Sequence, residues 1–210
     1  MLLRPASTHR PPEGVDPLAW ADALAEDTYE LVSALAGLEA ALVCPASERG
    51  RAEALVWPGT PIFQLPADRS AESGRASATQ GLDLLLGAGA DVAVVISDDV
   101  PDLPGLLLGK VFSALAGCPV AASPSTQPLH LDGRPAGGLV ALGARAPRAG
   151  WLPDLSLDDA LAVEVLHRAA PVRELTMTPG WARLRSTAEL RLLDDNLAGW
   201  PATRALLGRG

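Results

Sequence analysis

The sequence predicts a three-layer α/β/α sandwich built on a mostly parallel, doubly wound sheet. Short apolar segments of strand length alternate with longer segments that carry apolar residues at helical spacing. One apolar segment, 91–97 (DVAVVIS), is continuous and rich in β-branched residues, which is typical of a strand covered by helices on both faces. A chain of 210 residues is long enough for one such domain, 1–210, and requires no second.

The individual elements follow from this alternation. The first helix is predicted over 17–36, because Asp16 is a natural N-cap, Pro17 suits the first helical position and Gly37 ends the apolar pattern. Strands are predicted over 40–44, 61–65, 91–97, 119–123, 137–143 and 171–176. Further helices are predicted over 46–55, 75–87, 104–116, 157–169 and 186–197, and residues 1–16 form a Pro-rich opening segment.

Composition excludes several classes of function. The net charge is −8 and no local basic stripe is present, so nucleic-acid binding is not expected. No window reaches the roughly 18 uninterrupted apolar residues of a membrane span, and the first 12 residues lack the apolar core of a signal peptide. We therefore expect a cytoplasmic protein with no membrane partner; the oligomeric state is not indicated.

The two cysteines, Cys44 and Cys118, each lie in or beside an apolar run. A reduced cysteine in such a run behaves as a small hydrophobic residue. We expect two buried thiols, with a disulfide as the alternative.

Acidic residues cluster where the most apolar strand ends. Asp98 and Asp99 follow the strand directly, and Asp102 comes just past Pro101. Ligands of open α/β sheets bind at the carboxyl ends of the strands, where a carboxylate can hold Mg²⁺ or Mn²⁺ and the metal can bridge a diphosphate. Asp is also favoured in turns and N-caps, so Asp102 could instead cap the next helix. By residue type alone, both interpretations stand.

The stretch SDDVPDL, 97–103, with a strand before it and a helix after it, resembles a known motif. It is similar to the Gly-Thr-Asp-Cys-Pro-Asp-Leu motif of a bacterial family of GT-A-like glycosyltransferase homologues of unknown function, within the nucleotide-diphospho-sugar transferase superfamily. The segments 26–28 (EDT), 137–143 (GGLVALG) and 181–190 (WARLRSTAEL) resemble that family's first helix, a later strand and its closing segment, in the same order. The resemblance spans about residues 17–198.

This resemblance implies a single GT-A-like domain that binds a nucleotide or nucleotide-sugar and transfers a glycosyl or nucleotidyl group with Mg²⁺ or Mn²⁺. Asp99 aligns with the family's metal-site Asp, and Asp102 with its second Asp. The glycine pair would allow close backbone approach to a ligand. The residues expected to bind nucleotide or substrate are Arg4, Ser97, Asp98, Gly137 and Gly138.

Three departures from the family pattern affect its chemistry. The family opens with an apolar strand and a loop containing Pro, Gly, Lys and Arg, whereas this chain has only MLLRP before its Pro-rich segment, so the first strand is either absent or rudimentary. Arg183 and Arg185 stand where the family has two Asp residues. The glycine pair follows RPA, 134–136, where the family has acidic residues, and Leu and Val replace the aromatics after it.

An arginine cannot ligate a cation and would repel one, but it can neutralise a phosphate directly. Arg183 or Arg185 could also pair with Asp99 and occupy the place of the cation. The alternative function is therefore a catalytically inactive binding or partner module on the same fold. Further candidate contacts are His9, Arg10, His130 in the loop 124–136, and the pair Gly74-Arg75 before a predicted helix.

Overall fold

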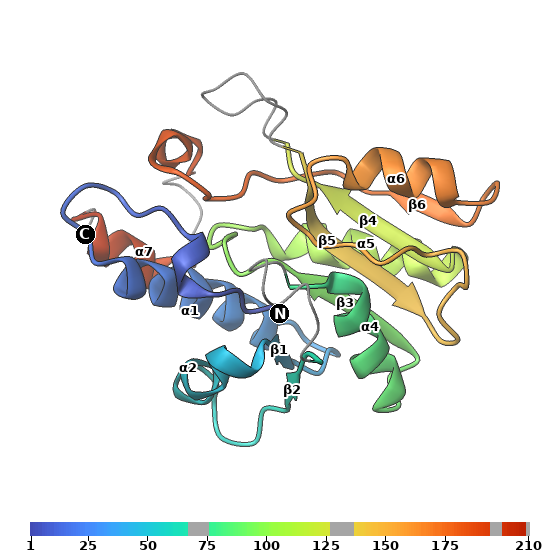
Figure 1. Cartoon of the computed structure of the whole chain (residues 1–210), viewed down its shortest axis with the longest axis horizontal. Helices are drawn as coiled ribbons and strands as arrows, with labels where there is room; N and C mark the ends of the chain where they lie inside the picture. The colour runs from blue at the N-terminus through green and yellow to red at the C-terminus, as the bar shows by residue number, and fades with distance from the viewer. Residues whose placement is uncertain (67–75, 127–136, 194–198, 209–210) are drawn as a thin grey trace.

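A computed structural model describes residues 1–66, 76–126, 137–193 and 199–208 (Figure 1). Its α-helices are α1 (Pro17–Ser33), α2 (Arg49–Leu55), α4 (Ala78–Gly87), α5 (Gly105–Gly117), α6 (Ala162–Ala169) and α7 (Pro201–Leu206). Its strands are β1 (Leu42–Cys44), β2 (Ile62–Gln64), β3 (Val92–Ile96), β4 (Val120–Pro124), β5 (Leu139–Arg145) and β6 (Leu175–Met177). Short 3-10 turns are η1 (Ala6–Thr8), η2 (Ala46–Glu48) and η3 (Thr187–Leu192).

The strands form two sheets, and Leu2 forms bridges to both of them. The larger sheet has the strand order β3-β5-β4-β6, with β5 antiparallel to both neighbours and β6 parallel to β4. In the smaller sheet, β1 pairs with β2 in parallel. Leu2 makes parallel bridges to Val43 of β1 and to Ser97 after β3, so the opening residues are a rudimentary strand between the two sheets. The predicted mostly parallel, doubly wound sheet is confirmed.

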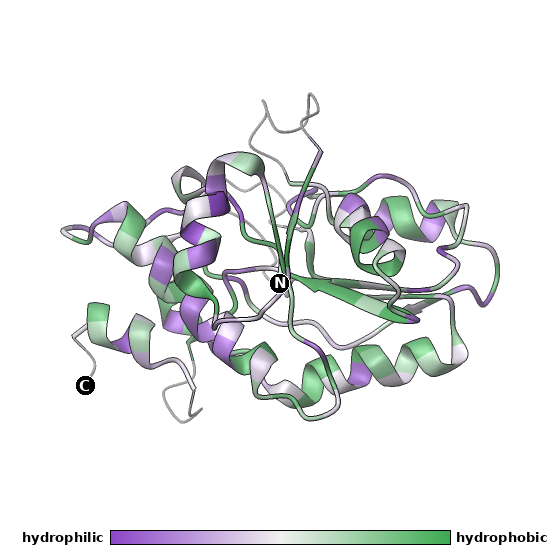
Figure 2. Ribbon diagram, turned by 90° about the horizontal axis from the view of Figure 1, so that it is seen from below, coloured by the Kyte–Doolittle hydropathy of each residue, from purple (hydrophilic) through white to green (hydrophobic). Residues whose placement is uncertain are grey.

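Helices cover both faces of this sheet, as the three-layer prediction requires. One core cluster packs α4 and α6, through Leu82 and Leu166, against the sheet face that contains Val95. A second cluster packs α1 and α5, through Tyr29 and Leu115, against the opposite face. Figure 2 views the strands from the side and shows helices above and below them.

Several element boundaries differ from the predictions. The first helix ends at Ser33 rather than at 36, and α6 begins at Ala162, because residues 157–161 form turns instead of helical backbone. Where a helix was predicted over 186–197, the described residues form a 3-10 turn over Thr187–Leu192 with a capping box between Ser186 and Glu189, and residues 194–197 lie outside the described ranges. The short helix α7 was not predicted.

The strand 91–97 is only partly buried, although near-complete burial was expected. Val95 and Ile96 are buried, whereas Val92 and Val94 are half-buried. The rudimentary strand reaches the Ile96–Ser97 end of β3, and among the described residues no strand pairs with the earlier residues of β3 on that side.

The cysteine prediction is confirmed, since Cys44 and Cys118 are both free and buried. Within the described ranges, no helix is both long enough and apolar enough to cross a membrane.

Candidate functional site

The candidate site forms where β3 ends. Ser97, Asp98 and Asp99 are completely buried there. The Ser97 N–H donates to the carbonyl of Val140, which extends the pairing with β5 past Ile96. The Leu184 N–H donates to the carbonyl of Asp99 at 2.8 Å, and this bond brings the segment 181–185 against the end of the strand.

Asp99 is held by two guanidinium groups and a hydroxyl. Arg183 binds it in a bidentate fork, with Nε 2.8 Å from Oδ1 and Nη2 3.1 Å from Oδ2. Arg4 places its Nη2 2.7 Å from Oδ2, and the Ser97 hydroxyl donates to Oδ1 at 2.6 Å. The bidentate pair offered as an alternative from the sequence is therefore present.

Asp98 is held by the opening segment of the chain. The backbone N–H of Arg4 donates to Oδ2 at 2.8 Å, and the Arg4 side chain donates from Nε to Oδ1 at 2.7 Å. The turn η1 follows Arg4 and brings His9 back, so that its Nε2 lies 3.4 Å from the same carboxylate. Arg4 thus bridges the two adjacent acids, and His9 is buried beside them.

Asp158 completes the cluster, and sequence reasoning missed it. Its Oδ1 lies 2.7 Å from Nη2 of Arg183, 3.2 Å from Nη1 of Arg4 and 3.8 Å from Nη2 of Arg185. The side chain is 22% exposed, against 0% for Asp99, so Asp158 is the carboxylate nearest solvent. Residues 157–169 were predicted to be one helix, and no spacing in the sequence connected Asp158 with Asp99.

The charges of this cluster balance. Asp98, Asp99 and Asp158 face Arg4, Arg183 and Arg185. Burial opposes ionisation of all three acids, yet the guanidinium groups hold the pKa of Asp98 and of Asp99 well below its usual range and lower that of Asp158 to about 2. Burial, reinforced by the neighbouring Arg183, lowers the pKa of Arg185 to about 10. The acids are therefore carboxylates at neutral pH.

The glycine pair packs closely against the turn that carries Asp158. A Cβ on Gly137 would lie 2.0 Å from the carbonyl oxygen of Ala160. Gly138 has φ +101°, and a Cβ there would lie 2.5 Å from the carbonyl oxygen of Leu157 and 2.8 Å from Nη2 of Arg185. The Gly137 carbonyl accepts a bond of 3.0 Å from Arg185. The glycines therefore lie close to the turn 157–160 of the same chain. Their contact with a ligand stays a prediction.

Asp102 does not cap the following helix. Its Oδ1 accepts a hydrogen bond of 3.0 Å from Nε1 of Trp181. Helix α5 has Pro104 at its N-cap and no side-chain cap. The N-cap interpretation is therefore wrong, and Asp102 instead fixes the start of the segment that carries Arg183.

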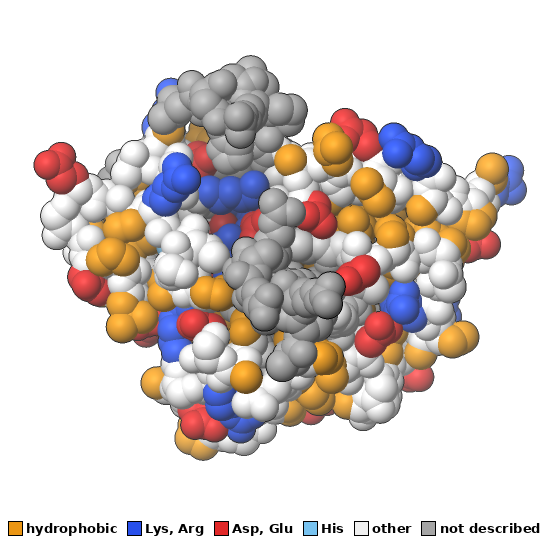
Figure 3. All heavy atoms as spheres, in the orientation of Figure 1, with side chains coloured by type: hydrophobic (Ala, Val, Ile, Leu, Met, Phe, Trp, Pro, Cys, Tyr) orange, Lys and Arg blue, Asp and Glu red, His pale blue; other side chains and the backbone are white. Residues whose placement is uncertain are grey.

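The remaining candidates are separate from the cluster or outside the described residues. Arg10 is exposed. Gly74, Arg75, His130 and most of the loop 124–136 fall outside the described ranges. Figure 3 shows basic and acidic side chains gathered side by side in the upper half of one face.

The residues at Asp99 do not suit Mg²⁺ or Mn²⁺. Both carboxylate oxygens are already bonded to guanidinium groups, and the positive charge of those groups repels a cation. Within the described part of the chain, no group of three or more His, Cys, Asp or Glu residues is arranged to hold a metal ion.

No protein-family model matches this chain, and no curated protein matches it. Solved structures do match it. A protein from Desulfovibrio desulfuricans G20, provisionally assigned as a nucleotide-diphospho-sugar transferase, aligns with a TM-score of 0.58 at 20% identity, covering 90% of this chain and 81% of the other.

Two further solved structures also align with this chain. CMP:2-keto-3-deoxy-manno-octonic acid synthetase, in complex with CTP, has a TM-score of 0.57 at 13% identity over 100% of this chain and 96% of its own. The 4-diphosphocytidyl-2C-methyl-D-erythritol synthase of Anaerococcus prevotii DSM 20548 has a TM-score of 0.59 at 10% identity over 98% and 93%. The chain therefore has a divergent form of the nucleotide-diphospho-sugar transferase fold.

Proposed function

We propose that this protein binds a nucleotide or nucleotide-sugar at the carboxyl end of β3, and that it does so without a divalent cation at Asp99. The observation that carries the proposal is the bidentate pairing of Arg183 with Asp99, reinforced by Arg4. Guanidinium groups supply there the positive charge that a metal ion would otherwise bring to a diphosphate.

The outer edge of the cluster is where a phosphate would bind. Asp158 and Arg185 are its partly exposed members, with side chains 22% and 14% exposed. Three guanidinium groups converge on one oxygen of Asp158, as they would on a phosphate oxygen. A ligand phosphate that displaced Asp158 would take over these partners while Asp98 and Asp99 kept theirs.

The structural relatives support a nucleotide as the ligand. One of them is described in complex with CTP, and another is named as a diphosphocytidyl-methylerythritol synthase. Ligands of such sheets bind at the carboxyl ends of the strands, which is where this cluster lies. Any glycosyl or nucleotidyl transfer would depend on the arginines for charge neutralisation.

The experiment is a thermal-shift screen of nucleoside triphosphates and nucleotide-sugars, run once with EDTA and once with Mn²⁺. We expect at least one nucleotide to raise the midpoint by about 5–10 °C at a hundredfold excess over Kd, equally in both conditions. Stabilisation only with Mn²⁺ would contradict the metal-free site.

Two variants localise the binding. Asp158→Asn removes the competing carboxylate and should tighten nucleotide binding, whereas Arg185→Gln should weaken it, both measured by calorimetry. An unchanged affinity in both variants would place the nucleotide elsewhere.

The second candidate is a catalytically inactive partner module. The observation that favours it is the complete burial of Asp98 and Asp99 inside a charge-balanced cluster. A chain that no nucleotide stabilises, with or without Mn²⁺, would support this candidate over the first.

A further inference from the structure

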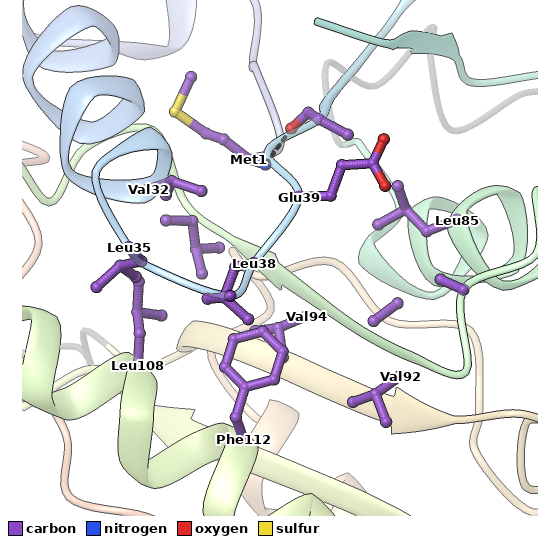
Figure 4. A pocket seen from close by; sticks show the side chains of 15 residues that line it. Met1, Val32, Leu35, Leu38, Glu39, Leu85, Val92, Val94, Leu108 and Phe112 are labelled. Carbon is purple, nitrogen blue, oxygen red and sulfur yellow. Dashed lines mark hydrogen bonds between the residues drawn. The ribbon is translucent and has the colours of Figure 1, made fainter.

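The opening residues of the chain are fixed at few points. Leu2 bridges to strands on both sides, and the Leu3 N–H donates to the carbonyl of Val43 at 2.8 Å. Met1 forms part of the wall of a pocket of about 300 Å³ (Figure 4), so space lies beside the chain at this point. The next residue after Leu3 is Arg4, whose N–H bonds to a side chain instead of a strand. The position of Arg4 therefore depends on contacts other than strand pairing.

The Arg4 backbone is held from two sides. Its N–H donates to Oδ2 of Asp98 at 2.8 Å, and its carbonyl accepts from Nη1 of Arg51 at 2.9 Å. Because Pro5 follows, the peptide unit after Arg4 has no N–H, and its carbonyl is the one group of that unit that can form a hydrogen bond. Arg51 therefore makes the backbone bond through which this peptide unit can be fixed.

Arg51 is anchored to other elements at the same time. It lies in the first turn of α2, and its Nε is 2.5 Å from Oδ1 of Asp22 in α1. Its Nη1 also lies 3.3 Å from Oε2 of Glu48 in η2. Figure 1 shows α2 next to α1 and close to the N-terminus. One guanidinium group thus joins the Arg4 carbonyl to three elements of the fold.

The helix itself does not account for an arginine at this position. The first turn of a helix carries partial positive charge, so a cation gains nothing there from the helix dipole. Arg49 lies in the same turn, but its side chain is 40% exposed and pairs with the exposed Glu53, whereas the Arg51 side chain is 10% exposed. Because the two arginines share a turn and differ in their contacts, Arg49 is a matched control for Arg51.

We propose that Arg51 is a positioning residue for the candidate site. By fixing the Arg4 carbonyl, it sets the direction in which the Arg4 side chain leaves the backbone. It thereby sets the place of the Arg4 guanidinium between Asp98 and Asp99. A lysine would keep the charge but has a single nitrogen in place of a planar fork, so it cannot make both contacts of Arg51 in this geometry.

The same restraint acts on ligand binding, and this step rests on the proposed function. Nη1 of Arg4 lies 3.2 Å from Oδ1 of Asp158, where the ligand phosphate would bind. A guanidinium that is already held in place loses less conformational freedom when the phosphate arrives. Arg51 therefore favours phosphate binding without touching the ligand.

The first test is hydrogen exchange at the Arg4 N–H and Nε–H, both of which donate to a carboxylate, followed by NMR in the full chain. The variant is Arg51→Lys, and Arg49→Lys makes the same change in the same turn of α2. The reference is the Thr178 N–H, which bonds to β4 at the far edge of the larger sheet. We expect Arg51→Lys to speed exchange at both Arg4 groups about fivefold or more relative to Thr178, and Arg49→Lys to leave this ratio unchanged.

A second variant, Arg51→Gln, removes the charge as well and should speed exchange at Arg4 at least as much. Unchanged exchange at Arg4 in both Arg51 variants would overturn the proposal. Equal acceleration at Arg4 and at Thr178 would also overturn it, because a general loss of stability acts on both groups. Acceleration in Arg51→Gln alone would support the positioning role and would show that one nitrogen is enough to hold the carbonyl.

The second test is the affinity for CTP in EDTA, measured by calorimetry. We expect Arg51→Lys to raise Kd about three- to tenfold and Arg49→Lys to leave it unchanged. An unchanged Kd in Arg51→Lys, together with faster exchange at Arg4, would overturn the effect on ligand binding. If the parent chain does not bind CTP, the proposed function fails for this nucleotide, while the exchange rates still decide the role of Arg51.

Discussion

Arg183 reaches back across 84 residues to Asp99, and its guanidinium has partners on every side. Besides the fork to Asp99, it donates to the carbonyls of Leu139 and Leu157 at 3.1 and 2.9 Å. Removing one partner from a buried pair leaves an uncompensated charge, which costs far more than the pair itself contributes. Arg183 and Asp99 are therefore expected to depend on each other for stability.

Asp99→Ala and Arg183→Ala should each lower the free energy of unfolding by about 3–5 kcal/mol, measured by urea denaturation. The control is Arg49→Ala, which breaks the exposed i,i+4 pair with Glu53 and should cost about 0.5 kcal/mol or less. The double variant Asp99→Leu/Arg183→Leu should lose less than the two single variants combined, because it leaves no charge unpaired. A loss below about 1 kcal/mol for Asp99→Ala would contradict the paired cluster.

At the scale of elements, the start of β5 is positioned by two glycines. They let the strand pass against the turn 157–160, and this contact places Asp158 and Arg185 at the same edge. The turn occupies positions that the apolar pattern had assigned to the first residues of a helix. A small residue is required here by contact between two segments of the chain.

Gly138→Ala should destabilise the protein by about 2–4 kcal/mol, because alanine is strained at φ +101° and its Cβ would overlap the Leu157 carbonyl. The matched control is Gly109→Ala in the middle of α5, where a Cβ meets nothing within 4 Å. That change should stabilise by about 0.5–1 kcal/mol. Similar midpoints for the two variants in thermal denaturation would argue against the close contact.

For the whole molecule, the buried acids make stability depend on pH in the acid range. Their folded pKa values lie below those of the unfolded chain, so the unfolded state binds more protons as pH falls. The stabilisation is complete above about pH 4 and is lost as pH falls through the folded values. For Asp158 that folded value is about 2.

Asp158→Asn should therefore reduce the loss of stability between pH 4 and 2 by about 2 kcal/mol, since that carboxylate no longer takes up a proton on unfolding. Urea denaturation at several pH values measures it. Asp83→Asn, which removes a half-exposed partner of Arg148, is the control and should change the curve much less. If the free energy of unfolding fell equally with pH in Asp158→Asn and in the parent chain, the lowered pKa of Asp158 would be contradicted.

Local patterns in the sequence were enough to predict the α/β alternation, a strand within 91–97, the buried thiols and the acids that follow this strand. These features depend on apolar periodicity and on capping or turn residues, whose effects act within a few positions. Arg183 and Arg185 stand where the resembled family has two Asp residues. Because an arginine cannot ligate a cation but can bind a carboxylate, this difference also indicated the pair with Asp99.

Tertiary structure decided the rest. Asp158 joined the cluster because a turn replaced the first residues of a predicted helix, and the glycine pair proved to contact that turn. The opening residues became a rudimentary strand because Leu2 pairs both with Val43 of β1 and with Ser97 after β3. Such contacts join residues far apart in the chain, and their energies come from packing and charge pairing between distant segments. Local periodicity cannot predict them, because it depends on residues within a few positions of one another.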